Sequence, residues 1–226
     1  MYKYPLTFSF SLFSLLPKIT VKDADGTVLL TASKRLLGAK DEVRVTANGQ
    51  PAFTVISQEN RIVDIPSNWD ILAADGKKVG VVDDDFLSAV DTSKFAPDMP
   101  GSTLMDMEIS RALNLRSVKM YWLKDAEGKK AGLVAPEQSS LMAMQLPFDR
   151  YIRQLPGILF RLITPRYYVR LGDETVMVLQ KKRTWMVDTY TLEMKAKFPA
   201  KDEALLINGV LLALVYERQR LKELYQ

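Results

Sequence analysis

The sequence predicts a mainly β fold that wraps one buried helix, and three observations support this prediction. Long parts of the chain alternate apolar and polar residues with the two-residue period of a half-buried strand. A short pattern ending in an acidic residue and a glycine returns with its glycine at 26, 76 and 128, and such periods are typical of repeated supersecondary units. Near the C-terminus, residues 204–216 are apolar on almost every side, as in a helix that is buried all round.

Composition narrows the classes of function. The chain has 226 residues, which suits one large β domain or two small ones, and 47% of them are hydrophobic, as in a folded protein. With the periodicity described below, we expect 1–226 to form a single domain. It contains no Cys and no His, which excludes disulfides and thiolate chemistry and removes the commonest general base and zinc ligand. The net charge of +4 is too mild to indicate nucleic acid as a partner. We therefore expect a protein that is not an enzyme and that uses no metal and no cofactor.

Residues 6–16 are apolar enough to resemble the core of a signal peptide. However, Leu6, Phe8 and Phe10 alternate with small polar residues, which is the period of a strand. Pro17 leads directly into another alternating run, without a small-residue cleavage site. We therefore predict that this segment is the first strand of a cytoplasmic protein.

Further strands are predicted wherever the alternation continues between turn signals. Asn48-Gly49 joins two alternating runs and is a strong hairpin signal. The repeated segments 19–26, 69–76 and 121–128, and more loosely 167–174, each read as a strand that enters a tight turn. The alternative is that Asp-x-Gly turns are common and the repeat is a coincidence. The predicted strands after the first are 19–21, 28–31, 42–46, 52–56, 62–65, 69–72, 79–82, 166–170, 176–181 and 185–195.

Two stretches break this pattern. Residues 83–110 hold seven acids against the single Lys94, and prolines interrupt them, so we predict an acidic connecting loop over 83–116. The stretch 136–165 is also irregular, and we expect a short helix there over 139–144 or 148–154.

The last element is a helix over about 202–221, as its charges indicate. Acids stand at its start and basic residues near its end, which suits the helix dipole. Its apolar run is 13 residues long, whereas about 20 are needed to cross a bilayer. Burial of its large side chains would contribute about 15–25 kcal/mol before opposing terms are counted. The core positions expected on this helix are Leu205, Leu206, Val210, Leu211 and Leu214.

Several segments together resemble a known family. They are Tyr4-Pro5-Leu6-Thr7-Phe8-Ser9-Phe10, Lys18-Ile19-Thr20-Val21-Lys22-Asp23-Ala24-Asp25-Gly26, Pro165-Arg166-Tyr167-Tyr168-Val169, Lys181-Lys182 and Tyr216-Glu217-Arg218. They resemble the bacterial members of the LURP-one-related family, which belongs with the Tubby C-terminal domain and the phospholipid scramblases. The resemblance covers nearly the whole chain and is weakest across 83–116 and 136–160. It implies a Tubby-like closed antiparallel β-barrel of about twelve strands around a central hydrophobic C-terminal helix, and closure removes exposed strand edges.

The resemblance also directs attention to three adjacent cations, Lys181, Lys182 and Arg183. In the Tubby relatives, basic residues on the barrel surface bind phosphoinositide headgroups, so this cluster is the candidate site for anionic lipid. Alternation along a strand places only two of the three on one face. The alternative is a hairpin of solvated charge.

Acidic residues offer weaker candidates. The scramblase relatives carry a calcium-binding segment before the terminal helix, but the matching stretch here keeps few oxygen ligands, among them Asp188 and Asp202. The run Asp83-Asp84-Asp85 is more typical of a solvated loop. Aromatic residues at 69, 121, 122, 167, 168 and 185 are interpreted as core rather than as a ligand pocket.

These observations lead to a non-enzymatic binding module whose target is an anionic lipid or membrane surface, at the periphery of a membrane. A regulatory or scaffold protein that binds another protein through the acidic loop 83–110 stays open as an alternative. A scramblase-like lipid mover is a third hypothesis, which requires a membrane-inserting helix.

Overall fold

The computed structural model describes residues 1–11, 18–35, 40–59, 68–83, 120–137, 166–182, 184 and 187–224, without the side chains of 217 and 219–224. The predicted strand at 62–65, most of the acidic loop 83–116 and both predicted short helices lie outside these residues.

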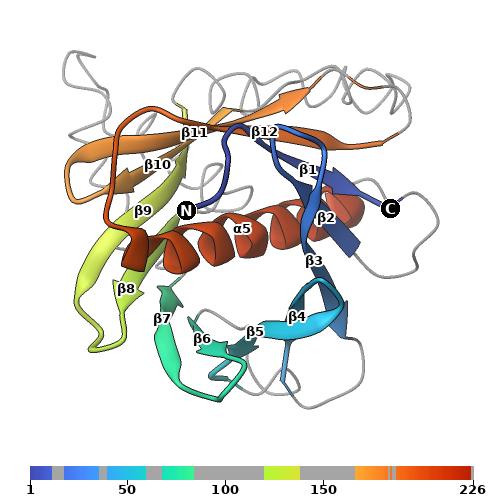
Figure 1. Ribbon diagram of the computed structural model, residues 1–226. Coiled ribbons are helices and arrows are strands. Elements are labelled where there is room, and N and C mark those ends of the chain that lie inside the picture. The colour runs from blue at the N-terminus through green and yellow to red at the C-terminus, as the bar shows by residue number, and fades with distance from the viewer. Residues whose placement is uncertain are drawn as a thin grey trace, which may run out of the picture.

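Twelve strands form a closed antiparallel barrel in which each strand pairs with the next and the last returns to the first (Figure 1). Closure comes from pairs such as Phe8 with Tyr190, which join the first and last strands. The predicted mainly β barrel is therefore confirmed. The strands are β1 (Leu6–Phe10), β2 (Lys18–Lys22), β3 (Val28–Arg35), β4 (Glu42–Ala47), β5 (Gln50–Ser57), β6 (Asn68–Ala73), β7 (Lys78–Asp83), β8 (Tyr121–Asp125), β9 (Lys130–Pro136), β10 (Arg166–Leu171), β11 (Glu174–Lys182) and β12 (Thr189–Met194).

The two ends of the barrel differ in their connections. At one end, here called the turn end, short turns at 23–27, 48–49, 74–77, 126–129 and 172–173 join the strands. At the other, the loop end, longer connections follow β1, β3, β5, β7, β9 and β11. This asymmetry matters because long connections and open barrel mouths are common places for function.

The repeated turn pattern has a simple physical basis. Asp23 Oδ1 accepts the backbone N–H groups of Asp25 and Thr27, at 3.0 and 2.9 Å. Gly26 then takes a positive φ of 83°, which side chains disfavour. The backbone bonds of this turn recur between β6 and β7 and between β8 and β9, where Gly76 N–H donates to the Ala73 carbonyl and Gly128 N–H to the Asp125 carbonyl. The sequence repeat is thus a repeat of hairpins.

One long helix, α5 (Glu203–Leu224), runs through the barrel after the 3₁₀ turn η2 (Ala200–Asp202) (Figure 1). The helix predicted over about 202–221 is therefore confirmed, although it begins one residue later and ends three residues later. From Leu205 to Val215 each apolar side chain is at most 4% exposed, and the inward side chains of the strands surround it as one core. No helix in the described part of the chain combines the length and apolarity needed to cross a membrane.

Glycines let α5 approach one side of the barrel closely. A Cβ added to Gly209 would lie 2.5 Å from Leu123 Cδ2, and one added to Gly80 would lie 2.7 Å from Leu205 Cδ1. Both distances are far shorter than van der Waals contact. The helix therefore packs directly on β7 and β8, where larger residues do not fit.

The N-terminal segment is tied to the start of α5 at the turn end. Glu203 accepts hydrogen bonds from the backbone N–H of Tyr2, at 2.9 Å, and from the Tyr4 hydroxyl, at 3.1 Å. An acidic residue suits the positive end of a helix dipole. Burial, with the Glu203 charge, raises the pKa of Tyr4, so this hydroxyl stays a donor.

Candidate functional site

The predicted basic cluster is not one surface patch. Lys181 follows the inward positions of β11, its side chain is 6% exposed, and its Nζ lies 2.9 Å from Asp188 Oδ1. Lys182 is exposed, as the alternation predicts, and Arg183 lies outside the described residues. Lys181 is already neutralised by a carboxylate and turned away from solvent. Of the two described cations, Lys182 alone is therefore on the outer surface.

The two acids considered for calcium lie at opposite ends of the barrel. Asp188 precedes β12 at the loop end and pairs with Lys181. Asp202 lies in η2, after β12 has crossed to the turn end. The length of a strand separates them, so they do not form one site.

The aromatic residues divide between the two sides of the wall. Trp69, Tyr121 and Tyr167 are buried, as the core interpretation expects. Trp122 and Tyr168, in contrast, occupy outward positions of β8 and β10. Trp185 lies outside the described residues. The core interpretation is thus wrong for Trp122 and Tyr168, because each follows an inward aromatic residue and must point the opposite way.

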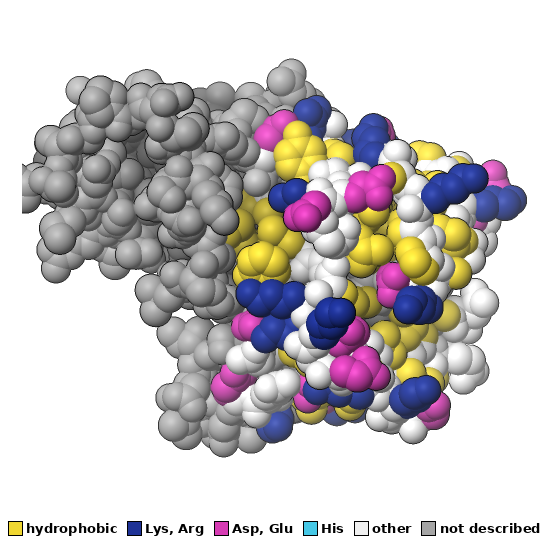
Figure 2. Space-filling model, turned by 90° about the vertical axis from the view of Figure 1, so that its left-hand side faces the viewer, with side chains coloured by type: hydrophobic (Ala, Val, Ile, Leu, Met, Phe, Trp, Pro, Cys, Tyr) yellow, Lys and Arg dark blue, Asp and Glu magenta, His cyan; other side chains and the backbone are white. Residues whose placement is uncertain are grey.

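These outward residues belong to a mixed patch, here called the tryptophan face: Trp122, Lys130, Leu133, Tyr168 and Arg170. The strand register places Trp122 opposite Leu133, and Leu133 opposite Arg170, so one row crosses β8, β9 and β10. Directly opposite residues have Cβ atoms about 4.5–5.5 Å apart. Figure 2 shows this side of the molecule, where apolar side chains lie among both basic and acidic ones. The patch therefore combines aromatic, aliphatic and basic groups on neighbouring strands.

Two cations of the tryptophan face have no carboxylate partner among the described residues. Lys130 Nζ lies 4.2 Å from the centroid of the Trp122 ring, which is a cation–π contact. Arg170 donates from Nη2 to the backbone carbonyl of Asp173, at 2.8 Å. No acid of the described chain lies within ion-pair distance of either. Both charges are thus available to an anionic partner.

Other cations on this side are already paired. Lys124 Nζ lies 2.5 Å from Asp83 Oδ2. Arg166 Nη1 lies 3.5 Å from Glu137 Oε1, which also accepts the Tyr168 hydroxyl at 2.6 Å. The hydrogen bond to Glu137 raises the pKa of Tyr168, so that its hydroxyl stays neutral. These ion pairs lie beside the tryptophan face and add no net charge to it.

Two donors of the tryptophan face also lack an acceptor within the described structure. They are Trp122 Nε1 and Arg170 Nε, and both atoms are covered by protein. A covered donor without an acceptor costs about 1–3 kcal/mol. Such groups are uncommon in folded proteins and call for an explanation.

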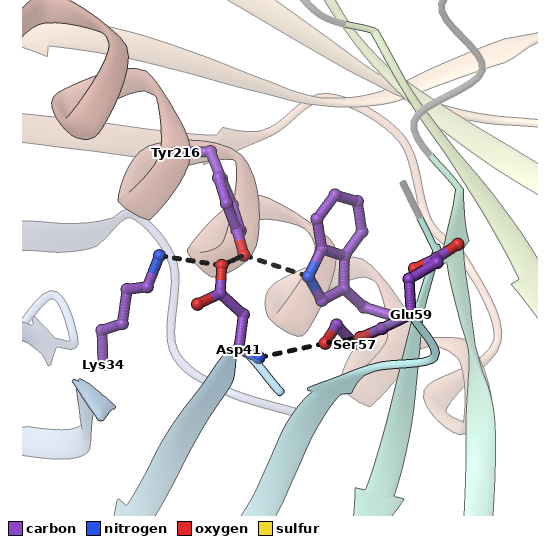
Figure 3. Close-up of polar contacts among 6 residues, drawn as sticks. Lys34, Asp41, Ser57, Glu59 and Tyr216 are labelled. Carbon is purple, nitrogen blue, oxygen red and sulfur yellow. Dashed lines mark hydrogen bonds and ion pairs between the residues drawn. The ribbon is translucent and has the colours of Figure 1, made fainter. Parts of the chain in front are cut away.

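A second polar cluster lies inside the loop end (Figure 3). Lys34 Nζ is 3.1 Å from Asp41 Oδ2, and both side chains are about 5% exposed. The Tyr216 hydroxyl donates to Asp41 Oδ2 at 2.8 Å and accepts from Trp69 Nε1 at 3.0 Å. Lys34 also lies 4.7 Å from the centroid of the Tyr216 ring. We call these four residues the loop-end network.

The loop-end network fastens α5 to the barrel wall. Its members come from β3, the residue before β4, β6 and α5, and Tyr216 stands where the buried part of the helix ends. Ser57 of β5 extends it, because its Oγ accepts the Asp41 backbone N–H at 3.0 Å. The lysine and the aspartate neutralise each other, so the arrangement suits holding the helix in place rather than acid–base chemistry.

Sequence reasoning missed both clusters, although part of the signal was present. Leu30, Ala32 and Lys34 alternate on one face of β3, so position alone turns Lys34 inward. A lysine is nevertheless almost never fully buried unless paired, and its partner Asp41 lies seven positions further along the chain. For Trp122, apolar neighbours on both sides hide the alternation.

Two comparisons with known proteins found no relative of this chain. A scan against models of protein families found no match, and neither did a search of curated proteins.

Proposed function

We propose that this chain is a non-enzymatic binding module that associates with anionic lipid surfaces through the tryptophan face. The single observation behind the proposal is that two cations without an acid partner in the described chain share the outer wall with Trp122. Lys130 lies over the Trp122 ring, and Arg170 stands two strands away in the same row. A cation near an anionic membrane contributes about 1 kcal/mol of binding free energy. Tryptophan and tyrosine are favoured at the boundary between water and lipid.

The apolar interior of the barrel favours a binding surface on the outside of the barrel wall. The buried part of α5, from Leu205 to Val215, packs with the inward side chains of the strands in one continuous apolar core. The proposal therefore uses the outside of the wall, as the sequence-based hypothesis did, but moves the contact from residues 181–183 to β8–β10. It also keeps the protein in the cytoplasm, at the periphery of a membrane.

Vesicle co-sedimentation tests the proposal. Pure protein is mixed with phosphatidylcholine vesicles that contain or lack phosphatidylglycerol, at low and at moderate salt. We expect binding only to the anionic vesicles, weaker at the higher salt because ions screen the attraction. The double variant Lys130→Gln/Arg170→Gln should bind about 25-fold more weakly, at about fivefold per cation.

The matched control is Lys18→Gln/Lys22→Gln, which removes two cations from β2. Both residues are exposed, and β2 lies on the side of the barrel opposite β8. The control should bind like the wild type. Equal losses in both double variants would mean that only net charge matters, and no binding by the wild type would refute the proposal. In that case a pull-down that depends on residues 86–108 would favour the protein-binding alternative.

A further inference from the structure

The chain contains the dipeptide Asn-Gly twice, in two opposite environments. Asn48 and Gly49 form the exposed two-residue turn between β4 and β5. Asn208 and Gly209 lie within α5, where the Asn208 side chain is 0% exposed. The same two residues therefore meet water at one place and the apolar core at the other.

Asn-Gly is a reactive dipeptide, because glycine has no side chain to cover its own backbone nitrogen. When that nitrogen attacks the asparagine Cγ, a new N–Cγ bond forms and the Cγ–Nδ2 bond breaks. Ammonia leaves with the proton of the backbone amide, and water then opens the resulting succinimide at either carbonyl. The products are aspartate and isoaspartate, whose main chain is one methylene longer. Each product carries a carboxylate in place of a neutral amide.

The turn leaves Asn48 open to this reaction. Ala47 pairs with Gln50, so the ladder hydrogen bonds that close the turn belong to these two residues rather than to Gly49. A Cβ added to Gly49 would meet nothing within 4 Å, so the turn has space to rotate. Asn48 has a φ of 52°, and aspartate also tolerates this left-handed conformation. The turn therefore accommodates aspartate as a product.

The helix prevents the same reaction at Asn208. The Asn208 Nδ2 donates to the Ala204 carbonyl at 2.8 Å, and the Gly209 N–H belongs to the hydrogen-bond ladder of α5. A Cβ added to Gly209 would lie 2.5 Å from Leu123 Cδ2, so the barrel wall also covers this glycine. Both the nitrogen that attacks and the nitrogen that leaves are thus held in place. Reaction at Asn208 requires the barrel to open.

Neither product fits the core at position 208. Aspartate would place a carboxylate where the side chain is 0% exposed, with its oxygens facing the Ala204 carbonyl, which is also an acceptor. Isoaspartate would lengthen the main chain inside the helix and interrupt its hydrogen-bond ladder. A chain that is modified here while open therefore cannot pack α5 again, and its unfolding becomes irreversible.

We propose that the two Asn-Gly pairs are sites of spontaneous deamidation with opposite consequences. Asn48 is modified in the folded protein, which keeps its fold and gains a negative charge at the turn end. Asn208 is modified only while the barrel is open, and the change excludes that chain from the native state. The Asn208 site thus limits how long an unfolded chain stays able to fold.

Peptide mapping by mass spectrometry measures both sites in one sample of the wild-type protein. Trypsin releases Asn48 and Asn208 in separate peptides, 45–61 and 202–218, and fragment spectra locate the change within each. Protein is kept in mildly alkaline buffer, either folded or in guanidinium chloride. In the denaturant both sites should react at similar rates, because the dipeptide is the same.

The folded sample should separate the two sites. Asn48 should still react there. Asn208 should react at least about a thousandfold more slowly than in the denaturant, because only about one chain in a thousand or fewer is open at equilibrium. Equal rates at Asn208 in the two samples would overturn its protection by the fold, and an unreactive Asn48 in the folded protein would overturn the claim for the turn.

Refolding tests the consequence. Protein aged in guanidinium chloride is diluted into buffer, and size-exclusion chromatography separates compact protein from aggregate. The compact fraction should contain deamidated Asn48 but only intact Asn208. Deamidated Asn208 in the compact fraction would show that the core accepts the product, and the proposed irreversibility would be wrong.

A matched pair of variants installs one product at each site without ageing. Asn48→Asp should give the same thermal unfolding curve as the wild type, whereas Asn208→Asp should show no cooperative transition. Cooperative unfolding of Asn208→Asp, or failure of Asn48→Asp to fold, would contradict the assigned consequences. Vesicle binding enters none of these measurements, so their outcome is independent of the proposed function.

Discussion

The ion pair between Lys34 and Asp41 is almost entirely removed from water, which makes it a sensitive test of the loop-end network. Both side chains are about 5% exposed, and the charged atoms lie 3.1 Å apart. The variant Lys34→Met keeps much of the aliphatic side chain but leaves the carboxylate with only its other partners. Asp41→Asn keeps an acceptor for the Tyr216 hydroxyl but removes the negative charge that the Lys34 ammonium group contacts.

The expected magnitudes follow from burial. At 3.1 Å, an effective dielectric constant of about 20 gives an attraction of roughly 5 kcal/mol, and removal of two ions from water costs several kcal/mol each. The attraction between the two ions therefore nearly offsets the cost of removing them from water, whereas one ion alone carries that cost without the attraction. Each single variant should lower the free energy of unfolding by about 3–5 kcal/mol. The double variant Lys34→Met/Asp41→Asn should lower it by only about 1–2 kcal/mol, because no uncompensated charge remains.

Urea unfolding, followed by circular dichroism and by tryptophan fluorescence, measures these values. A typical domain is stable by about 5–15 kcal/mol, so each single loss is large enough to observe. The control is Lys3→Met, which removes an exposed partner of Asp25 and should change stability by less than about 1 kcal/mol. Additive effects in the double variant, or single losses below about 1 kcal/mol, would show that the two ions are hydrated and that the reasoning is wrong.

Three further predictions concern the helix and the outer wall. Gly209→Ala should destabilise the barrel by about 1–3 kcal/mol, because the new Cβ would lie 2.5 Å from Leu123; thermal unfolding checks this. Leu211→Asp should abolish folding, since the carboxylate would enter a position that is 0% exposed, and a cooperative transition in circular dichroism would contradict it. Glu137→Gln should lower the pKa of Tyr168 towards its ordinary value in an ultraviolet pH titration, because the carboxylate that stabilises the neutral phenol is gone. In the wild type, the hydrogen bond from the neutral Tyr168 hydroxyl to Glu137 stabilises the folded state fully at neutral pH, because the pKa of Tyr168 is raised. This stabilisation is lost as the pH rises through the folded-state pKa of Tyr168.

Local signals account for the parts of the fold that the sequence predicts well. The turn before Gly26 needs only an aspartate and a glycine within a few residues, and both its hydrogen bonds lie within that window. The buried helix is likewise recognisable from one continuous apolar run. Asn208 and Gly209, which interrupt this apolar run, each have a role in the helix. Gly209 allows close contact with Leu123, and Asn208 Nδ2 donates to the Ala204 carbonyl at 2.8 Å.

Features that depend on distant partners were not predictable. Phe8 meets Tyr190 only because ten intervening strands bring the sheet back on itself, and no local pattern encodes that register. The same holds for the loop-end network, where Lys34 is buried because Asp41 and Tyr216 arrive from other elements. Lys181 was expected at the surface because its residue type favours water. Its position on β11 turns it inward, where Asp188 makes burial tolerable.

The order of the elements along the chain has a consequence for synthesis. α5 lies at the centre of the barrel, yet it follows all twelve strands in the sequence, and β1 closes the wall only with β12. A nascent chain that has emerged as far as β11 therefore has neither its core nor a partner for the free edge of β1. Such a sheet exposes apolar surface and unpaired backbone groups, which are hazards for aggregation. The barrel can become native only after the helix is released, so folding must be completed late and is a natural point for chaperone assistance.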